Sequence, residues 1–220
     1  YAYHKAVQKI HNFCVNELGG IYLDIVKDRL YTCKSDSVAR RSCQTSLDYL
    51  LNILVRLIAP ILSYTAEEIW QSSERLNNQE ESIFLSNYDL SEINEESIIT
   101  KSDWNRIFEI KNDVNQSIEE MRNENQLKGS LDANVYIEAN KNDIKILEKL
   151  GAELHFLFIC SKTNIIENNN FKITVKSSSN QKCTRCWHRH ESVGTSKKHP
   201  DLCTRCIETV DGEGEKRSCV

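Results

Sequence analysis

The chain has 220 residues, of which 40% are hydrophobic and 27% charged, and its formal net charge is −4. This length suffices for one or two domains with a buried core. No apolar run approaches the ~20 residues of a membrane span, and the sequence opens on an amphipathic helical pattern instead of a signal peptide. The chain does not begin with methionine, and its only methionine is Met121, so we expect the C-terminal end of a longer protein. We also expect that protein to be cytoplasmic and monomeric.

The first part of the chain, residues 1–126, has the apolar spacing of helices. A first helix is predicted to run through Leu18 and to end at Gly19-Gly20, and a second to run from Ile21 to Leu30. A third begins near Asp36, and the residues expected on its buried side are Leu47, Leu50, Leu51, Leu54 and Ile58.

Pro60 is predicted to interrupt this third helix. Thr65 to Glu68 has the sequence of a capping box, in which the threonine hydroxyl and the glutamate carboxylate each accept a backbone N–H at the start of a helix. Residues 77–89 form a predicted polar loop, and the apolar residues over 107–121 predict another long helix.

The pattern changes after residue 126. Leu131 to Glu138 and Phe171 to Lys176 are predicted strands, Asp143 to Leu150 is a predicted helix, and the apolar run from Leu154 to Cys160 fits either. The predicted fold is mainly α: a helical bundle over residues 1–126, a small α/β junction segment over 127–180, and a four-cysteine zinc-finger module with its tail over 181–220.

The nine cysteines fall into two groups. Cys14, Cys33, Cys43 and Cys160 stand singly in apolar or helical patterns, which is typical of reduced cysteine in a cytosolic protein. The others, except for Cys219 near the end of the chain, form two close pairs: Cys183 with Cys186, and Cys203 with Cys206.

These two pairs form the strongest motif of the sequence. A two-residue spacer lets both sulfurs of a pair face one ion, and two such pairs complete a tetrahedral thiolate site. Four protein ligands leave no open position, so we expect one structural Zn²⁺. The alternatives are two disulfides or two unconnected pairs. His188, His190 and His199 could substitute as ligands but are expected to be surface residues.

The predicted zinc module is locally basic. Between residues 182 and 206 six lysines and arginines stand against two acids, and the charge of a four-thiolate zinc site leaves a net of about +2. A basic module with Trp187 beside one cysteine pair suits phosphate contact and base stacking, with Arg185 and Arg205 as further candidates. The alternative is that Trp187 only packs over the metal site.

A second basic stretch surrounds residues 27–41 of this acidic chain. Its lysines and arginines, Lys27, Arg29, Lys34, Arg40 and Arg41, outnumber two aspartates. Such a stretch on a helix is often only a solvated face.

This basic stretch and the sequence on either side of it resemble a known family. Tyr22-Leu23-Asp24, Lys27 to Tyr31, Ser37 to Thr45 and Ala59 to Trp70 are similar to the anticodon-binding helical bundle of class I aminoacyl-tRNA synthetases. Ile, Val and Leu enzymes share that general pattern.

The second half of the chain resembles one branch of this family. Cys183-Thr184-Arg185-Cys186-Trp187-His188, the second cysteine pair and Gly212 to Arg217 are similar to the C-terminal zinc module of bacterial-type isoleucyl-tRNA synthetases. Lys128 to Ala133 resembles the segment that joins bundle and zinc module there. The resemblance covers nearly the whole chain in the same order, although residues 167–170 and 177–182 have no residue-level match.

The resemblance implies a tRNA-binding role. The complete enzyme would attach isoleucine to its tRNA with ATP and Mg²⁺, and would have upstream catalytic and editing domains. The catalytic motifs H-I-G-H and K-M-S-K-S are absent from this sequence, so we expect no catalytic residue here. We expect the chain to hold the anticodon stem-loop of isoleucine tRNA.

The residues expected to contact the tRNA are Lys34, Arg40, Arg41, Arg185, Trp187 and Arg205. Unstacked anticodon bases would stack on aromatic rings, and lysines and arginines would hold phosphates.

Two other classes of protein remain as alternatives. One is a zinc-bearing nucleic-acid-binding or purely structural module outside the synthetases. Formamidopyrimidine-DNA glycosylases have a related finger, but there the last cysteine is followed by Gln, whereas Ile207 follows Cys206. The other is the end of a valyl or leucyl synthetase, which the zinc tail disfavours.

Overall fold

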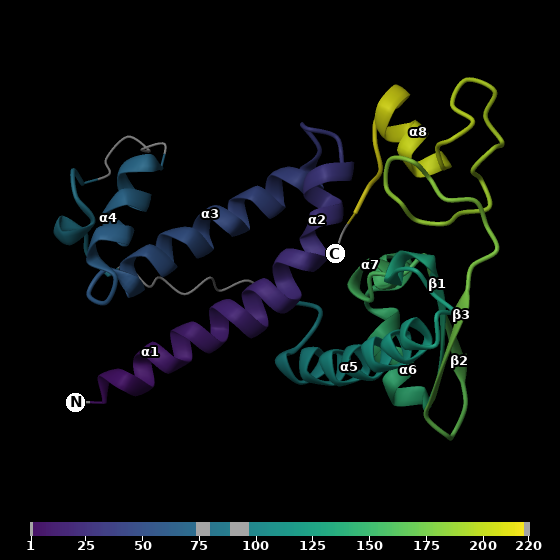
Figure 1. Ribbon diagram of the computed structural model, residues 1–220, viewed down its shortest axis with the longest axis horizontal. Helices are drawn as coiled ribbons and strands as arrows, with labels where there is room; N and C mark the ends of the chain where they lie inside the picture. The colour runs from purple at the N-terminus through teal and green to yellow at the C-terminus, as the bar shows by residue number, and fades with distance from the viewer. Residues whose placement is uncertain (1, 74–79, 89–96, 218–220) are drawn as a thin grey trace.

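The computed structural model describes residues 2–73, 80–88 and 97–217. Figure 1 shows the helices of the first 72 residues extending away from a compact body, which contains a small sheet and its covering helices. The mainly α fold with a small sheet is therefore confirmed. The division at residues 126 and 180 stays a prediction. None of the helices in the described part of the chain is long and apolar enough to span a membrane.

One continuous helical rod occupies residues 3–32. It consists of α1 (Tyr3–Asn12), a π-helical segment (Phe13–Tyr22) and α2 (Leu23–Thr32). The predicted helix end at Gly19-Gly20 is therefore wrong. In the wider π-helical turn a Cβ on Gly19 would lie 2.9 Å from the carbonyl oxygen of Cys14, so the missing side chain lets the rod continue here.

The second long helix, α3 (Val38–Ile58), begins at Ser37, whose hydroxyl accepts the N–H of Arg40. Its predicted buried face is only partly buried, because Leu51 is exposed while Ala39, Cys43 and Val55 are buried. The helix ends before Pro60, as predicted.

A small satellite core holds the far end of α3. Helix α4 (Ser63–Ser72) and a 3-10 turn at Ile83–Leu85 pack there around Trp70, which is 2% exposed. The predicted capping box at Thr65 is wrong, because α4 already begins at Ser63 and has no side-chain cap. Glu67 instead accepts the backbone N–H of Ile83, which ties the turn to the helix.

The main core lies between α5 and the sheet. Helix α5 (Lys101–Asn123) starts with a capping box formed by Thr100 and Asp103. Its buried face, which includes Ile107, Ile110 and Val114, belongs to the same apolar cluster as the first strand and Phe158. This long helix, which the sequence predicts, is therefore part of the sheet body.

The sheet has three strands in the order β2-β1-β3. Strand β1 (Ala133–Ala139) pairs in parallel with β2 (Lys162–Glu167) and antiparallel with β3 (Lys172–Ser177). Between β1 and β2 the chain forms α6 (Lys141–Glu148), a 3-10 turn and the short α7 (Leu154–Leu157). The apolar run from Leu154 is thus largely helical. Strand β2, in contrast, is not predicted from the sequence.

The last part of the chain forms a small module with α8 (Thr204–Asp211) as its only regular helix in the described residues. Two cysteine-bearing turns face each other across its centre, and the module lies beside α2 and α7 (Figure 1).

Candidate metal centre and nucleic-acid interface

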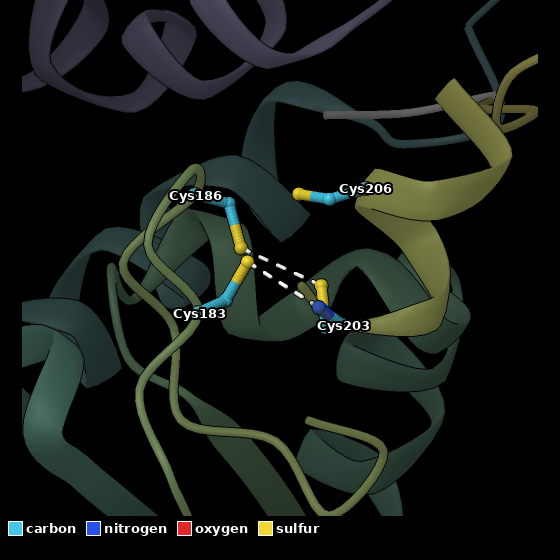
Figure 2. A group of neighbouring side chains, drawn as sticks. All are labelled: Cys183, Cys186, Cys203 and Cys206. Atoms are coloured by element: carbon cyan, nitrogen blue, oxygen red, sulfur yellow. Dashed lines mark hydrogen bonds between the residues drawn. The ribbon is translucent and has the colours of Figure 1, made fainter. Parts of the chain in front are cut away.

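Four cysteines meet at the centre of the C-terminal module. Cys183 and Cys186 come from one turn, while Cys203 immediately precedes α8 and Cys206 lies in its first turn. All four are buried, and their sulfurs lie within 4.8 Å of one another (Figure 2). The structure thus brings together the four cysteines that the sequence spacing predicts as ligands. The eight cysteines of the described residues are all free thiols.

The geometry of the cluster fits a tetrahedral thiolate site. The Cys186 and Cys203 sulfurs are 3.7 Å apart, which is far longer than a disulfide bond of about 2.05 Å. Zinc–sulfur bonds of about 2.3 Å give a tetrahedron with edges of about 3.8 Å. Hydrogen bonds between the sulfurs lower the pKa of the Cys203 thiol and raise the pKa of the Cys206 thiol, as expected of closely spaced thiols that share protons.

Arginines of the module bind it to α2. The Arg205 guanidinium forms two hydrogen bonds with the carboxylate of Asp28, at 2.7 and 3.0 Å. Burial alone would raise the pKa of Asp28, but the hydrogen bonds and charge of Arg205 hold it well below its usual range. Arg185 donates to the carbonyl oxygen of Thr32 at 2.7 Å, so two of the predicted RNA contacts face protein groups.

The predicted contacts on the first helices have different surroundings. Lys34 donates to the carbonyl oxygen of Gly212 at 2.8 Å, which also joins α2 to the module. Arg41 is exposed to solvent near the start of α3, whereas Arg40 is half-buried and its Nε has no hydrogen-bond partner. Of these three side chains, only that of Arg41 is both exposed and without a hydrogen bond to the module.

Trp187 is the exposed aromatic residue beside the cluster. Its side chain is 60% exposed, and its backbone has a φ of 66°. A bulky residue at positive φ is a genuine outlier that costs about 1–3 kcal/mol. The Lys182 ammonium lies over the indole at 5.5 Å from the ring centroid. The chain therefore keeps a large, strained aromatic residue at a position that would favour glycine.

A cavity of about 540 Å³ opens next to Trp187. Helix α2 supplies one wall and the first cysteine turn another, with Leu131 and Phe156 from the sheet body between them. Lys27 and Tyr31 on α2 are exposed and also line it. In the sequence, Lys27 is recognisable only as part of a basic stretch, and neither Tyr31 nor Phe156 stands out, because their juxtaposition depends on the docking of the module.

Comparison with known proteins then decides the family. The family described as the anticodon-binding domain of tRNA ligase matches residues 1–144. The chain belongs to this anticodon-binding family. A second family, the zinc finger found in FPG and IleRS, matches residues 180–209 and so includes all four cysteines of the cluster.

Curated relatives of this anticodon-binding chain are named isoleucine–tRNA ligases. The relative from Shewanella halifaxensis is 42% identical over 231 residues, which covers 99% of this chain and 24% of the relative. Those from Stutzerimonas stutzeri and Legionella pneumophila are 41% and 39% identical, again over 99% of this chain and 24% of each relative. The chain thus spans about a quarter of the length of these relatives.

Proposed function

We propose that this chain is the C-terminal, anticodon-recognising portion of an isoleucine–tRNA ligase. Catalysis with ATP and Mg²⁺, and editing, would then belong to upstream domains of the same polypeptide, which would act as a cytoplasmic monomer. The proposal is supported by relatives of that name over 99% of the chain. The observation that carries it is Trp187, a strained and exposed aromatic residue at a cavity between the anticodon-binding helices and the cysteine module.

The cavity suits an unstacked base of the anticodon loop of isoleucine tRNA. An exposed indole offers a stacking surface worth about 1–3 kcal/mol per base. Tyr31 on α2 also lines the cavity and offers a second aromatic ring to a base. Lys27 lines it too, and its exposed ammonium, which pairs with Asp24 at 2.7 Å, is available to a phosphate. The ion pair between Arg205 and Asp28 joins the cysteine module to α2, and the cysteine cluster lies beside the turn that bears this indole.

The predicted RNA-binding residues divide into two roles in this proposal. Trp187 and Arg41 are accessible and would contact RNA directly, with Arg40 next to Arg41 on α3. Lys34, Arg185 and Arg205 are already bound to protein groups. Their role would be to hold the module against α2.

The cysteine cluster would bind one structural Zn²⁺. The ligands would be Cys183, Cys186, Cys203 and Cys206, whose spacing and burial fit a closed four-thiolate site. When bound, the ion would cross-link the two cysteine turns. It would thereby fix the turn that positions Trp187, which directly follows Cys186.

The alternatives have less support. A DNA-glycosylase-type finger shares the zinc-finger family, but the anticodon-binding family covers residues 1–144. Valyl or leucyl synthetases would share only the helical part, whereas the named relatives match through the cysteine module.

Substitution of Trp187 by glycine tests the proposal. Glycine adopts the positive φ without strain, so the variant is expected to keep its fold and metal while its affinity for an isoleucine tRNA transcript falls roughly tenfold. Trp187→Phe is the matched control, because it keeps a stacking ring. Affinity is measured by fluorescence anisotropy at fixed salt. An unchanged affinity in Trp187→Gly would contradict a role of this residue in RNA binding.

A further inference from the structure

The residues after α8 return to α2 and α7. In Figure 1 this yellow segment runs from α8 to a position beside α2. Gly214 has a φ of 92°, a backbone conformation that favours glycine, and it lies against the side chain of Lys34. The segment then places Glu215 and Arg217 between α2 and α7. We call these two residues the clasp.

The clasp completes a buried network of four charges. Arg217, whose side chain is 1% exposed, contacts both the Asp28 carboxylate and Glu215. Glu215 also accepts hydrogen bonds from Arg205 at 3.2 Å and from the thiol of Cys33 at 3.3 Å. Two carboxylates thus balance two guanidinium groups. Removal of one of the four groups leaves a buried charge uncompensated. The network therefore strongly favours one position of the cysteine module and the clasp relative to α2.

The same arginines hold Phe156, which lines the cavity. The Arg217 guanidinium lies over its ring at 3.5 Å from the centroid, and that of Arg205 lies at 4.9 Å. His188, the neighbour of Trp187, meets the Phe156 ring edge-on at a centroid distance of 5.6 Å. A continuous series of contacts therefore leads from Arg217 through Phe156 and His188 to the turn that bears Trp187.

Asp28 connects the clasp to the opposite wall. Its carboxylate binds Arg205 and Arg217, and its residue lines the cavity together with Lys27 and Tyr31 on α2. Both walls of the cavity are thus joined through the same ion pairs. The spacing between Trp187 and α2 depends on these contacts, although Arg217 itself does not line the cavity.

We propose that Arg217 is a positioning residue for RNA recognition: it fixes Phe156 and Asp28 so that the Trp187 turn and α2 stand at the spacing that one unstacked base requires. This inference rests on the proposed function. It assigns a role in RNA recognition to a residue that does not itself line the cavity.

The test compares Arg217→Ala with Lys216→Ala. Both variants lose one positive charge from adjacent residues, but Lys216 is exposed and outside the clasp. Binding to an isoleucine tRNA transcript is measured by fluorescence anisotropy, and zinc is quantified in each sample. We expect Arg217→Ala to bind about tenfold more weakly with its zinc retained, and Lys216→Ala to bind like the parent chain. Arg217→Lys keeps the charge and is expected to recover part of the affinity.

A double-mutant cycle with Trp187 separates positioning from a general structural role. If Arg217 acts through the Trp187 turn, Arg217→Ala will cause little further loss in a Trp187→Gly background. Additive losses would overturn the inference, as would loss of zinc from Arg217→Ala or equal binding by the Arg217 and Lys216 variants. A Trp187→Gly chain that binds like the parent would instead contradict the role of Trp187 in RNA binding, and this inference with it, because the inference rests on that role.

Discussion

At the residue scale, buried and half-buried titratable groups surround the junction between the module and α7. His155 on α7 lies next to Phe156 and 5.7 Å from His188, measured between ring centroids. Burial lowers the pKa of His155 to about 4, and the positive charges of Arg205 and Arg217 act in the same direction. The imidazole is therefore neutral in the folded protein at pH 7, with its Nδ1 hydrogen-bonded to the carbonyl oxygen of Ala152.

This lowered pKa predicts a loss of stability in mild acid. Between pH 6.5 and about 4 the unfolded chain binds a proton at His155 that the folded chain does not, so the free energy of unfolding decreases as the pH falls. From pH 7 to pH 5 this contributes at most about 2 kcal/mol, because His155 is only half-buried. Urea unfolding of the parent chain and of His155→Phe, which cannot titrate, measures the difference. Parallel pH profiles would contradict the prediction.

At the element scale, the cysteine module has little apolar material of its own. Its separate core consists of the four cysteines and Val193, with Leu202 packed against them. Such a small core does not normally sustain a fold without a metal or disulfides. The two cysteine turns and α8 therefore depend on the ion, whereas α3 and α5 pack in other clusters.

This dependence predicts different effects for two cysteine substitutions. Cys203→Ser is expected to lower the zinc content clearly below the one ion per chain of the parent and to weaken tRNA binding, because the Trp187 turn loses its cross-link. Cys14→Ser, on the helical rod, is expected to leave both unchanged. Elemental analysis and circular dichroism check this, and a full zinc content in Cys203→Ser would argue against the four-thiolate site.

Sequence patterns recovered the elements whose signals are local. Helix α5 follows its apolar spacing, β3 its alternation, and the cysteine cluster its two-residue spacers. Two local signals misled. Gly19-Gly20 normally ends a helix, but here the glycines fit a π-helical turn. Thr65 has a capping sequence, but α4 had already begun.

The remaining features depend on contacts between distant parts of the chain. The apolar pattern of strand β2 is too short to predict a strand from the sequence, and the strand is recognised only by its parallel pairing with β1. Asp28 and Arg217 are 189 residues apart in sequence, and no spacing rule predicts such a pair. For the same reason Arg205, which the sequence suggests as an RNA contact, turns out to bind Asp28.

At the scale of the whole molecule, binding of RNA has to overcome an overall charge of −4. Long-range attraction to phosphate is therefore weak, and affinity must come from local contacts such as stacking and a few exposed lysines and arginines. The cavity of about 540 Å³ unites α2, α7 and the cysteine module in one such place. We therefore expect the chain to distinguish between anticodon bases, which attraction to phosphate alone cannot do because the phosphates are the same for every base.

The most direct measurement is a titration of the zinc-loaded chain with two tRNA transcripts that differ only in the anticodon, at one fixed salt concentration. The proposed function predicts clearly tighter binding to the transcript with the isoleucine anticodon. Equal affinities for the two transcripts would contradict anticodon recognition by these residues.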